Sequence, residues 1–333
     1  MTKLRRSIAG LAVAALALTG CGSSDEASED GPTITLGVAS LPIFAPVFVA
    51  DEKGYFEDRG LDVELEFVQT GQDAIPLLSS GQMDALAAGF SAGVFSGLDE
   101  GLEFRIVGSM GVAAGSDYAP AHLIVRDDLV EDGTVTDIAD LQDLNIGVAG
   151  GEGGTGAFLT AQGLEEADLS ITDVNLQNVG NPDMPAALDN GSIDAGLMSA
   201  PFSENALNDG IGESVWYPPE GTSGTGLMYG EHFLDREEAD LLFEALAEAA
   251  DELQGDARYS EEYLDIVGNA IGQSGEDLQG VPLYTWYSDL RPLPDQLAAM
   301  ESVWLEYGAL TYDEPLDPEE YIDSSFSDAV SNE

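Results

Sequence analysis

The chain has 333 residues, 44% of them hydrophobic, which is enough for two domains with proper cores. It carries 63 acidic against 10 basic residues, and its formal net charge is −53. Nucleic acid and anionic lipid bind to basic patches, so this composition excludes both as partners. We expect an acidic surface of the halophilic kind, whose self-repulsion the ions of a saline medium would screen.

The first 21 residues resemble an export signal. Three basic residues precede an apolar run, residues 8–18, which is shorter than the roughly 20 residues that span a bilayer. The run ends in Leu-Thr-Gly-Cys21, which resembles the lipobox of bacterial lipoproteins and makes Cys21 the predicted lipidation site. The alternative is an ordinary cleaved signal with a chance cysteine. Residues 22–32 are small and acidic, and they are predicted to form a flexible tether.

Alternating patterns begin at residue 33. Residues 33–39 alternate and are rich in β-branched side chains, which predicts a strand. Residues 46–56 predict a helix closing on Gly54, and residues 61–67 predict a second strand. Strands that alternate with helices indicate parallel-type sheets flanked by helices, so the predicted class is α/β.

The same pattern returns further along the chain. Gly37-Val-Ala recurs as Gly147-Val-Ala, and Leu78-x-x-Gly-x-Met-Asp-Ala recurs as Leu188-x-x-Gly-x-Ile-Asp-Ala, at one common offset. A shared offset indicates two α/β units of similar build, with chance matching of common residue types as the alternative. Ligands of parallel sheets collect at the carboxyl ends of the strands. We therefore place the candidate site in the loops after residues 39, 88, 149 and 198.

One of these loops, residues 147–158, reads GVAGGEGGTGAF and precedes a helix predicted to begin near Thr155. Glycine lets the backbone approach a ligand closely, and the first amides of a helix are free donors. The loop thus predicts a pocket for a polar or anionic group, with a merely flexible turn as the alternative. Glu152 would oppose an anion unless it faces outward. The match to the dinucleotide pattern Gly151-x-Gly-x-x-Gly is weak by itself.

A serine hydrolase is an alternative function. Gly89-Phe-Ser91-Ala-Gly matches the nucleophile elbow, and of the two histidines only His232 follows Ser91 at a plausible distance. An oxyanion-hole run of the His-Gly-Gly type is absent from the sequence. Two distant histidines and a lipidated cysteine cannot form a zinc cluster, so we expect no metal and no cofactor. A lipid-anchored signalling or adhesion module is a third possibility.

Helical patterns dominate from about residue 231. Residues 236–254 place leucines on one stripe, and residues 294–307 begin with proline and stop at Gly308. Both are predicted to pack on the outside of the sheets. Several aromatic residues near the proposed site could stack on a ligand ring, although packing in the core is the alternative for each: Phe44, Phe90, Tyr118, Phe202, Tyr284, Trp286 and Tyr287.

Several stretches together resemble the extracytoplasmic binding proteins of bacterial ABC importers. Beside the lipobox they are residues 37–46, the stretch GYFEDRGLDVE at 54–64, residues 81–85 and Tyr321-Ile-Asp323. The resemblance is strongest to the group that binds nitrate, sulfonates, taurine and the pyrimidine precursor of thiamine, and it covers most of residues 33–326. A pyrimidine-synthesising relative carries a cysteine-rich motif, which this chain lacks.

The resemblance implies a type II periplasmic-binding-protein architecture, with a cleft between two lobes that close on a solute. Residues 33–120 would form lobe 1 and residues 121–228 lobe 2, with 229–333 returning to lobe 1. It implies a membrane-anchored monomer that delivers a small organic solute to ABC permease subunits and is not an enzyme. The net charge favours a neutral or zwitterionic solute. The residues implied to meet the solute are Leu41, Phe44, Phe90, Ser91, Gly153, Gly154, Thr155, Pro201 and Phe202.

Overall fold

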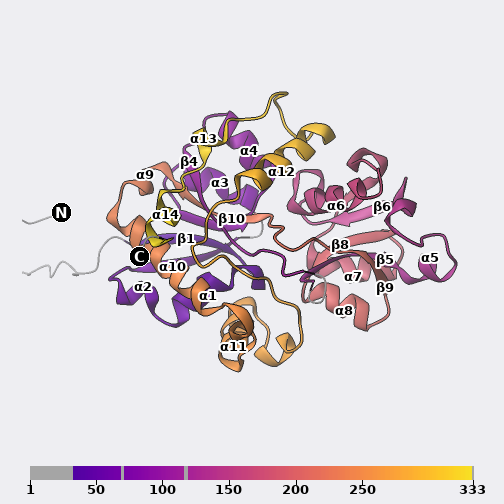
Figure 1. Cartoon of the computed structure of the whole chain (residues 1–333), viewed down its shortest axis with the longest axis horizontal. Helices are drawn as coiled ribbons and strands as arrows, with labels where there is room; N and C mark the ends of the chain where they lie inside the picture. Colours follow the sequence, from indigo (N-terminus) through magenta and orange to yellow (C-terminus); the bar gives the residue numbers. More distant parts are fainter. Residues whose placement is uncertain (1–32, 69–70, 116–118, 332–333) are drawn as a thin grey trace, which may run out of the picture.

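The computed structural model describes residues 33–68, 71–115 and 119–331, so the predicted signal, Cys21, the tether and Tyr118 lie outside the described residues. Two lobes lie side by side along the long axis of the molecule (Figure 1). Lobe 1 is built on a five-stranded sheet of order β2-β1-β3-β10-β4, and lobe 2 on a five-stranded sheet of order β7-β6-β8-β5-β9. No helix of the described part has the length and apolarity to cross a bilayer.

Both sheets are mixed. In lobe 1, β1 is parallel to β2 and β3, whereas β10 runs antiparallel to β3 and β4. In lobe 2, β6 is parallel to β7 and β8, whereas β5 runs antiparallel to β8 and β9. The lobe-1 strands are β1 (Ile34–Ala39), β2 (Val63–Val68), β3 (Ala85–Gly89), β4 (Phe104–Ser109) and β10 (Thr225–Gly230). The lobe-2 strands are β5 (Ala121–Arg126), β6 (Asn145–Val148), β7 (Asn175–Asn178), β8 (Ala195–Ser199) and β9 (Gly212–Trp216).

The α/β class is therefore confirmed, with one opposed strand inside each parallel set. These opposed strands are the ones by which the chain enters lobe 2, as β5, and returns to lobe 1, as β10. The repeated Asp-Ala motif has the same role in both lobes: Asp84 Oδ2 accepts a hydrogen bond from the Thr35 backbone N–H at 2.9 Å, and Asp194 Oδ2 accepts one from Asn145 at 3.0 Å. Each aspartate thus ties the start of one parallel strand to its neighbour.

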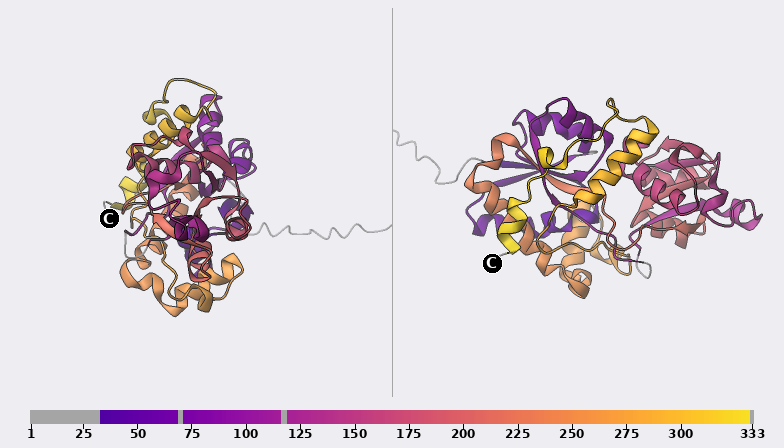
Figure 2. Two further views of the ribbon diagram at one scale, coloured as in Figure 1. Left: turned by 90° about the vertical axis from the view of Figure 1, so that its right-hand side faces the viewer. Right: turned by 45° about the horizontal axis from the view of Figure 1, so that its top comes forward.

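Helices cover both faces of each sheet (Figure 2). Those of lobe 1 are α1 (Ala45–Glu52), α2 (Tyr55–Asp58), α3 (Gly71–Ser79), α4 (Ala92–Asp99), α9 (Glu231–Leu234), α10 (Glu237–Glu252), α11 (Glu261–Ile271), α12 (Pro294–Tyr307), α13 (Pro318–Tyr321) and α14 (Ser325–Ser331). Those of lobe 2 are α5 (Asp127–Glu131), α6 (Thr155–Glu165), α7 (Met184–Asp189) and α8 (Phe202–Asn208). Gly54, with φ of 76°, separates α1 from α2 in a backbone conformation that favours glycine.

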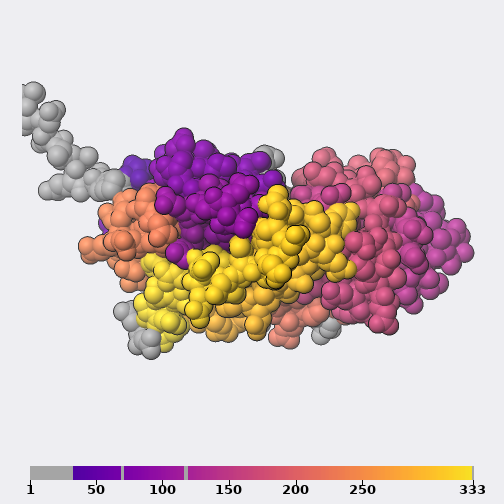
Figure 3. All heavy atoms as spheres, turned by 90° about the horizontal axis from the view of Figure 1, so that it is seen from above, coloured from indigo at the N-terminus to yellow at the C-terminus, as the bar shows by residue number. Residues whose placement is uncertain are grey.

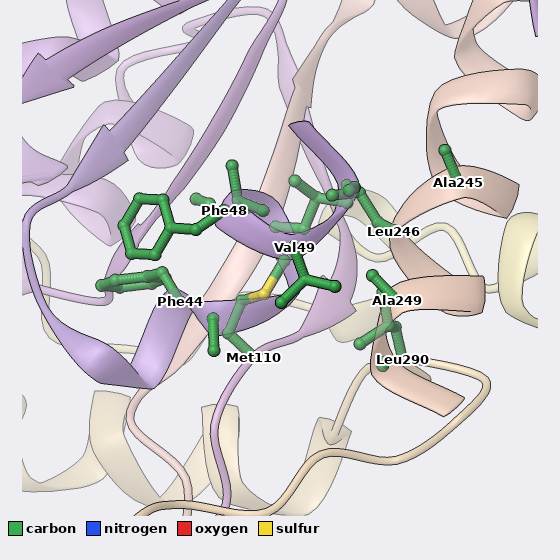
Figure 4. Close-up of a cluster of buried hydrophobic side chains, with 14 of the residues drawn as sticks. Phe44, Phe48, Val49, Met110, Ala245, Leu246, Ala249 and Leu290 are labelled. Carbon is green, nitrogen blue, oxygen red and sulfur yellow. The ribbon is translucent and has the colours of Figure 1, made fainter. Parts of the chain in front are cut away.

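The core of lobe 1 lies between the sheet and the helices α1, α10 and α11. Figure 4 shows Val49 of α1 beside Leu246 and Ala249 of α10, whereas the rings of Phe44 and Phe48 lie on the side of α1 away from α10. Phe44, only 1% exposed, belongs to the same cluster. Burial of such large apolar side chains contributes on the order of 2 kcal/mol each, so this layer fixes α1 and the loop that precedes it.

Candidate functional site

The two lobes meet where the loop after β3 faces the start of α6. Thr155 Oγ1, on the first turn of α6, donates towards the carbonyl oxygens of Phe90 at 2.8 Å and Gly224 at 3.1 Å. A Cβ added to Gly153 would lie 3.0 Å from the Cβ of Ala92. We call this contact region the interlobe seam: residues 90–92 and Gly224 of lobe 1 against residues 153–155 of lobe 2. The lobes are thus closed on each other in this structure.

The seam lies at the carboxyl ends of the parallel strands of both sheets. Phe90 directly follows β3, and its N–H donates to Gly224 O at 2.9 Å, where the chain re-enters lobe 1. In lobe 2, the seam residues follow β6, and Ser199 at the end of β8 pairs with the first residue of β5. Ser199 Oγ lies 3.4 Å from Tyr284 Oη of lobe 1. The loops after β3, β6 and β8 therefore all face the other lobe.

The glycines before α6 are required by the turn itself. Gly151 has φ of 63°, and a Cβ added to Gly154 would lie 2.2 Å from the carbonyl oxygen of Ala149. Gly154 is also the N-cap of α6 and supplies no side-chain oxygen to the first amides of the helix. The glycine-rich loop therefore leaves the amino end of α6 uncapped at the seam, where it attracts hydrogen-bond acceptors.

Ser91 is the N-cap of α4, the other helix that begins at the seam. The residue is 8% exposed, its backbone is extended with φ of −153°, and its hydroxyl neither caps the helix nor has another hydrogen-bond partner among the described residues. Buried hydroxyls nearly always have a partner, because an unmade hydrogen bond costs about 1–3 kcal/mol. Ser91 therefore presents a free polar group beside the uncapped amino ends of α4 and α6.

The remaining residues implied to meet a solute come from the segment before α1 and from the loop after β8. Leu41 is half-buried against the lobe-1 core, and the Phe44 ring lies inside that core. Pro201 is buried in the loop after β8, and the half-buried Phe202 begins α8. Trp286 Nε1 donates to Ile43 O at 2.9 Å, so this indole ties the loop before α1 to the C-terminal segment.

Glu152, in the glycine-rich loop, is exposed, and its carboxylate lies beside the hydroxyl of Tyr307 on α12. Burial together with this carboxylate raises the pKa of Tyr307. The carboxylate of Glu152 is thus next to the carboxyl end of α12.

The basic residues of the described chain are all engaged elsewhere. Six of the seven pair with carboxylates, and Arg258 lies over the Tyr259 ring. Arg105, Arg126 and Arg236 lie at the edges of the two sheets opposite the seam, two of them beside Asp84 and Asp194, which precede β3 and β8. Among the described residues, no cation is therefore left to neutralise an anion at the seam.

The structure separates the two residues of the hydrolase alternative. His232 contacts Asp84 at 3.1 Å, before β3, whereas Ser91 follows β3, so the two lie roughly 20 Å apart along the strand direction. A nucleophile elbow also holds its serine in a strained conformation, and the extended backbone of Ser91 has no such strain. Ser91 and His232 thus cannot form a nucleophile–base pair.

Three contacts between the lobes have no clear signal in the sequence. Gly224 lies opposite Thr155, Ser199 lies opposite Tyr284, and α12 reaches lobe 2 at its carboxyl end. Gly224 is one of 39 glycines, and its partner is far away in the chain. Only the repeated placement of loops at the carboxyl ends of both sheets could have indicated such partners.

The family model described as the NMT1-like family matches residues 27–221. The chain belongs to the NMT1-like family. This match and the structures below confirm the resemblance inferred from the sequence. A search of curated proteins found no match to this NMT1-like chain.

Three solved structures share the fold of this NMT1-like protein. The periplasmic aliphatic sulphonate binding protein SsuA from Escherichia coli has 16% identity and a TM-score of 0.69, over 88% of this chain and 93% of that one. The periplasmic nitrate-binding protein NrtA from Synechocystis PCC 6803 has 16% identity and a TM-score of 0.68, over 90% and 85%. The desulfurization enzyme DSZB has 16% identity and a TM-score of 0.61, over 91% and 99%. Binding proteins and an enzyme thus share this two-lobe fold.

Proposed function

We propose that this protein is the solute-binding component of an ABC importer, which captures a small organic solute between its lobes outside the cytoplasm. The solute would meet the loops at the seam, through Leu41, Phe44, Phe90, Ser91, Gly153, Gly154, Thr155, Pro201 and Phe202. Cys21, in its lipidated form, would anchor the protein to the membrane, and the tether after it would let the lobes reach the permease subunits. Two of the fold relatives are named as periplasmic binding proteins, which supports this role.

The observation that carries the proposal is the free hydroxyl of Ser91 at the meeting point of two lobes. Both α4 and α6 begin there, and neither has a side-chain cap. Two uncapped amino ends and one unpaired hydroxyl form a set of donors without acceptors of their own. A solute with acceptor oxygens or ring nitrogens would satisfy them from both lobes at once and so favour the closed state.

The charges of the protein favour a neutral or zwitterionic solute. A nitrate or a simple sulfonate would enter a protein of net charge −53 and find all seven basic side chains of the described residues engaged elsewhere. A zwitterion such as taurine has an ammonium group that the acidic surface attracts. The free N–H groups at the helix amino ends would donate hydrogen bonds to its anionic group. A neutral pyrimidine would rely on stacking and a few hydrogen bonds.

Native mass spectrometry of gently purified protein tests the proposal first, because a co-purified solute would appear as a discrete mass. Thermal unfolding with added taurine, alkanesulfonates, nitrate and neutral pyrimidines comes next. A solute at 100 times its dissociation constant adds about 2.7 kcal/mol to the free energy of unfolding. Stabilisation by taurine or a pyrimidine, but not by nitrate, is the expected result. No bound mass and no stabilisation by any of these solutes would contradict the binding role.

A further inference from the structure

Helix α12 begins in lobe 1 and ends against lobe 2. The Trp304 ring packs 5.4 Å from the ring of Phe95 on α4, and Leu297 and Met300 line a small cavity together with Phe90 and Ile106 of lobe 1. One turn further on, Glu306 Oε1 accepts a hydrogen bond of 2.6 Å from Ser170 Oγ in lobe 2. The Tyr307 hydroxyl lies beside the carboxylate of Glu152, also in lobe 2. Figure 3 shows the C-terminal part of the chain, in yellow, lying across both lobes.

The other end of α12 is bound to the segments that cross between the lobes. These two segments, residues 110–113 and 221–225, run side by side: Ala113 N–H donates to Thr222 O at 2.7 Å, and Gly221 N–H donates to Ala113 O at 3.0 Å. Gln296, in the first turn of α12, accepts from Ser223 N–H at 2.6 Å and donates to Gly221 O at 2.5 Å. One side chain therefore fixes α12 to the crossing segment by two hydrogen bonds.

We propose that α12 is a latch that holds the lobes closed. Its middle is packed into lobe 1 and its first turn is bound to the crossing segment, so α12 moves with lobe 1. A rotation of lobe 2 away from lobe 1 must then separate Ser170 from Glu306 and Glu152 from Tyr307. These two contacts stabilise the closed state, and they do so whether or not a solute is bound. They thereby raise the fraction of molecules already closed, on which apparent solute affinity depends.

The test measures the distance between the lobes in the absence of solute. Spin labels would be attached at Glu57→Cys, exposed on α2, and at Glu131→Cys, exposed on α5, in the full chain carrying Cys21→Ser. Figure 1 shows α2 and α5 at opposite ends of the molecule, so opening of the lobes changes this distance. Since Cys21 is the only natural cysteine, the labels report these two sites alone. Pulsed electron spin resonance then gives the distribution of distances.

The latch variant is Glu306→Ala combined with Tyr307→Phe. It should raise the ratio of open to closed molecules about tenfold, because two polar contacts, each worth about as much as an ordinary hydrogen bond, are lost from the closed state alone. Glu306→Gln, which keeps an acceptor for Ser170, should stay close to the parent. Asp295→Ala, which removes an exposed carboxylate from the first turn of the same helix, should leave the distribution unchanged.

The same distance distribution in parent and latch variant would overturn the proposal. Circular dichroism checks that each variant is folded. If the double variant does not fold, it is replaced by Tyr307→Phe alone, which removes a single oxygen atom. In that single variant a rise of about threefold is expected, and no change would again overturn the latch. Because no solute is added, a negative result here would leave the proposed binding role intact.

Discussion

Gly224 and Thr155 approach so closely across the interlobe seam that a Cβ added to Gly224 would lie 2.0 Å from Thr155 Cγ2. A methyl group at this position therefore obstructs the closed state and leaves each lobe unaffected on its own. We expect Gly224→Ala to weaken solute binding at least about tenfold, as overpacking of 1–3 kcal/mol implies. The dissociation constant, measured by calorimetry with the solute identified above, provides the check.

A second substitution should reverse this effect. Thr155→Ser removes Cγ2 and keeps the hydroxyl, so Gly224→Ala combined with Thr155→Ser should recover most of the affinity. Gly226→Ala is the contrast: its methyl would lie 2.2 Å from the Phe90 ring and 2.6 Å from Gly108 O, both within lobe 1. That variant should lose stability without solute, and Thr155→Ser should not rescue it. Tight binding by Gly224→Ala alone would show that the seam does not close on the solute.

Ser91→Ala should separate binding from stability. The Ser91 hydroxyl has no hydrogen-bond partner in the part of the chain that the structure describes, so its removal should leave the free energy of unfolding of the solute-free protein unchanged or raise it by about 1 kcal/mol. The stabilisation by solute should fall by a similar amount. Ser109→Ala is the matched control, because Ser109 is 2% exposed, has an unpaired hydroxyl and lines a cavity of about 10 Å³ behind Phe90. A solute-induced shift that survives in Ser91→Ala but is lost in Ser109→Ala would refute this assignment.

His122 should make the protein less stable in mild acid. Burial lowers the pKa of His122 below its ordinary 6.5, and Nδ1 lies 2.8 Å from Ser214 Oγ. Between the folded-state pKa and 6.5 the unfolded chain binds a proton that the folded chain does not, so the free energy of unfolding falls as the pH drops through this window. Urea unfolding of wild type and His122→Gln at pH 5.5 and 7.5 measures this contribution together with that of Glu204, whose carboxylate lies 3.8 Å from His122 Nε2.

In that comparison the wild type should gain more stability than the variant on going from the lower to the higher pH. An equal gain in both proteins would mean that the proton affinity of His122 does not change on folding.

Salt should stabilise the folded protein. Seven basic residues in the described part offset few of the chain's 63 acids, so carboxylates on the folded surface repel one another. The screening length falls from about 10 Å in 0.1 M salt to about 3 Å in 1 M salt, which weakens this repulsion most in the compact state. The urea midpoint should therefore rise between 0.1 and 2 M NaCl. An equal rise of the urea midpoint in sucrose of matched osmolality would show that exclusion of the additive from the protein surface causes the effect. A urea midpoint that does not rise with NaCl would contradict the saline adaptation.

Local signals predicted the elements well. The helix expected over residues 294–307 is α12 with the same bounds, because Pro294 is favoured at the first position of a helix and Gly308, with φ of 76°, ends it. The strand expected over 33–39 is β1, Ile34–Ala39, and the helix expected near Thr155 begins at that residue. Each of these depends on residues that are neighbours in the chain.

Local signals did not reveal contacts between residues that lie far apart in the chain. Residues 294–307 were expected to pack on the outside of the sheets, yet α12 also contacts lobe 2, because Glu306 and Tyr307 meet residues more than 130 positions earlier. Phe44 is a proposed solute contact, and its ring also belongs to a lobe-1 core cluster that includes residues of α1 and α10, which the sequence did not indicate. Neither sequence neighbourhood differs from that of an ordinary surface helix or loop.

The central place of β10 in the lobe-1 sheet has a consequence for how the chain is assembled. Since β10 lies between β3 and β4, the sheet of lobe 1 has a vacant middle position until residues 225–230 have emerged from the ribosome or export channel. Every strand of the lobe-2 sheet, residues 121–216, emerges before then and can pair at once. The half of the molecule that is made first is thus completed last, and a chaperone that shields the exposed edges of β3 and β4 would act during that interval.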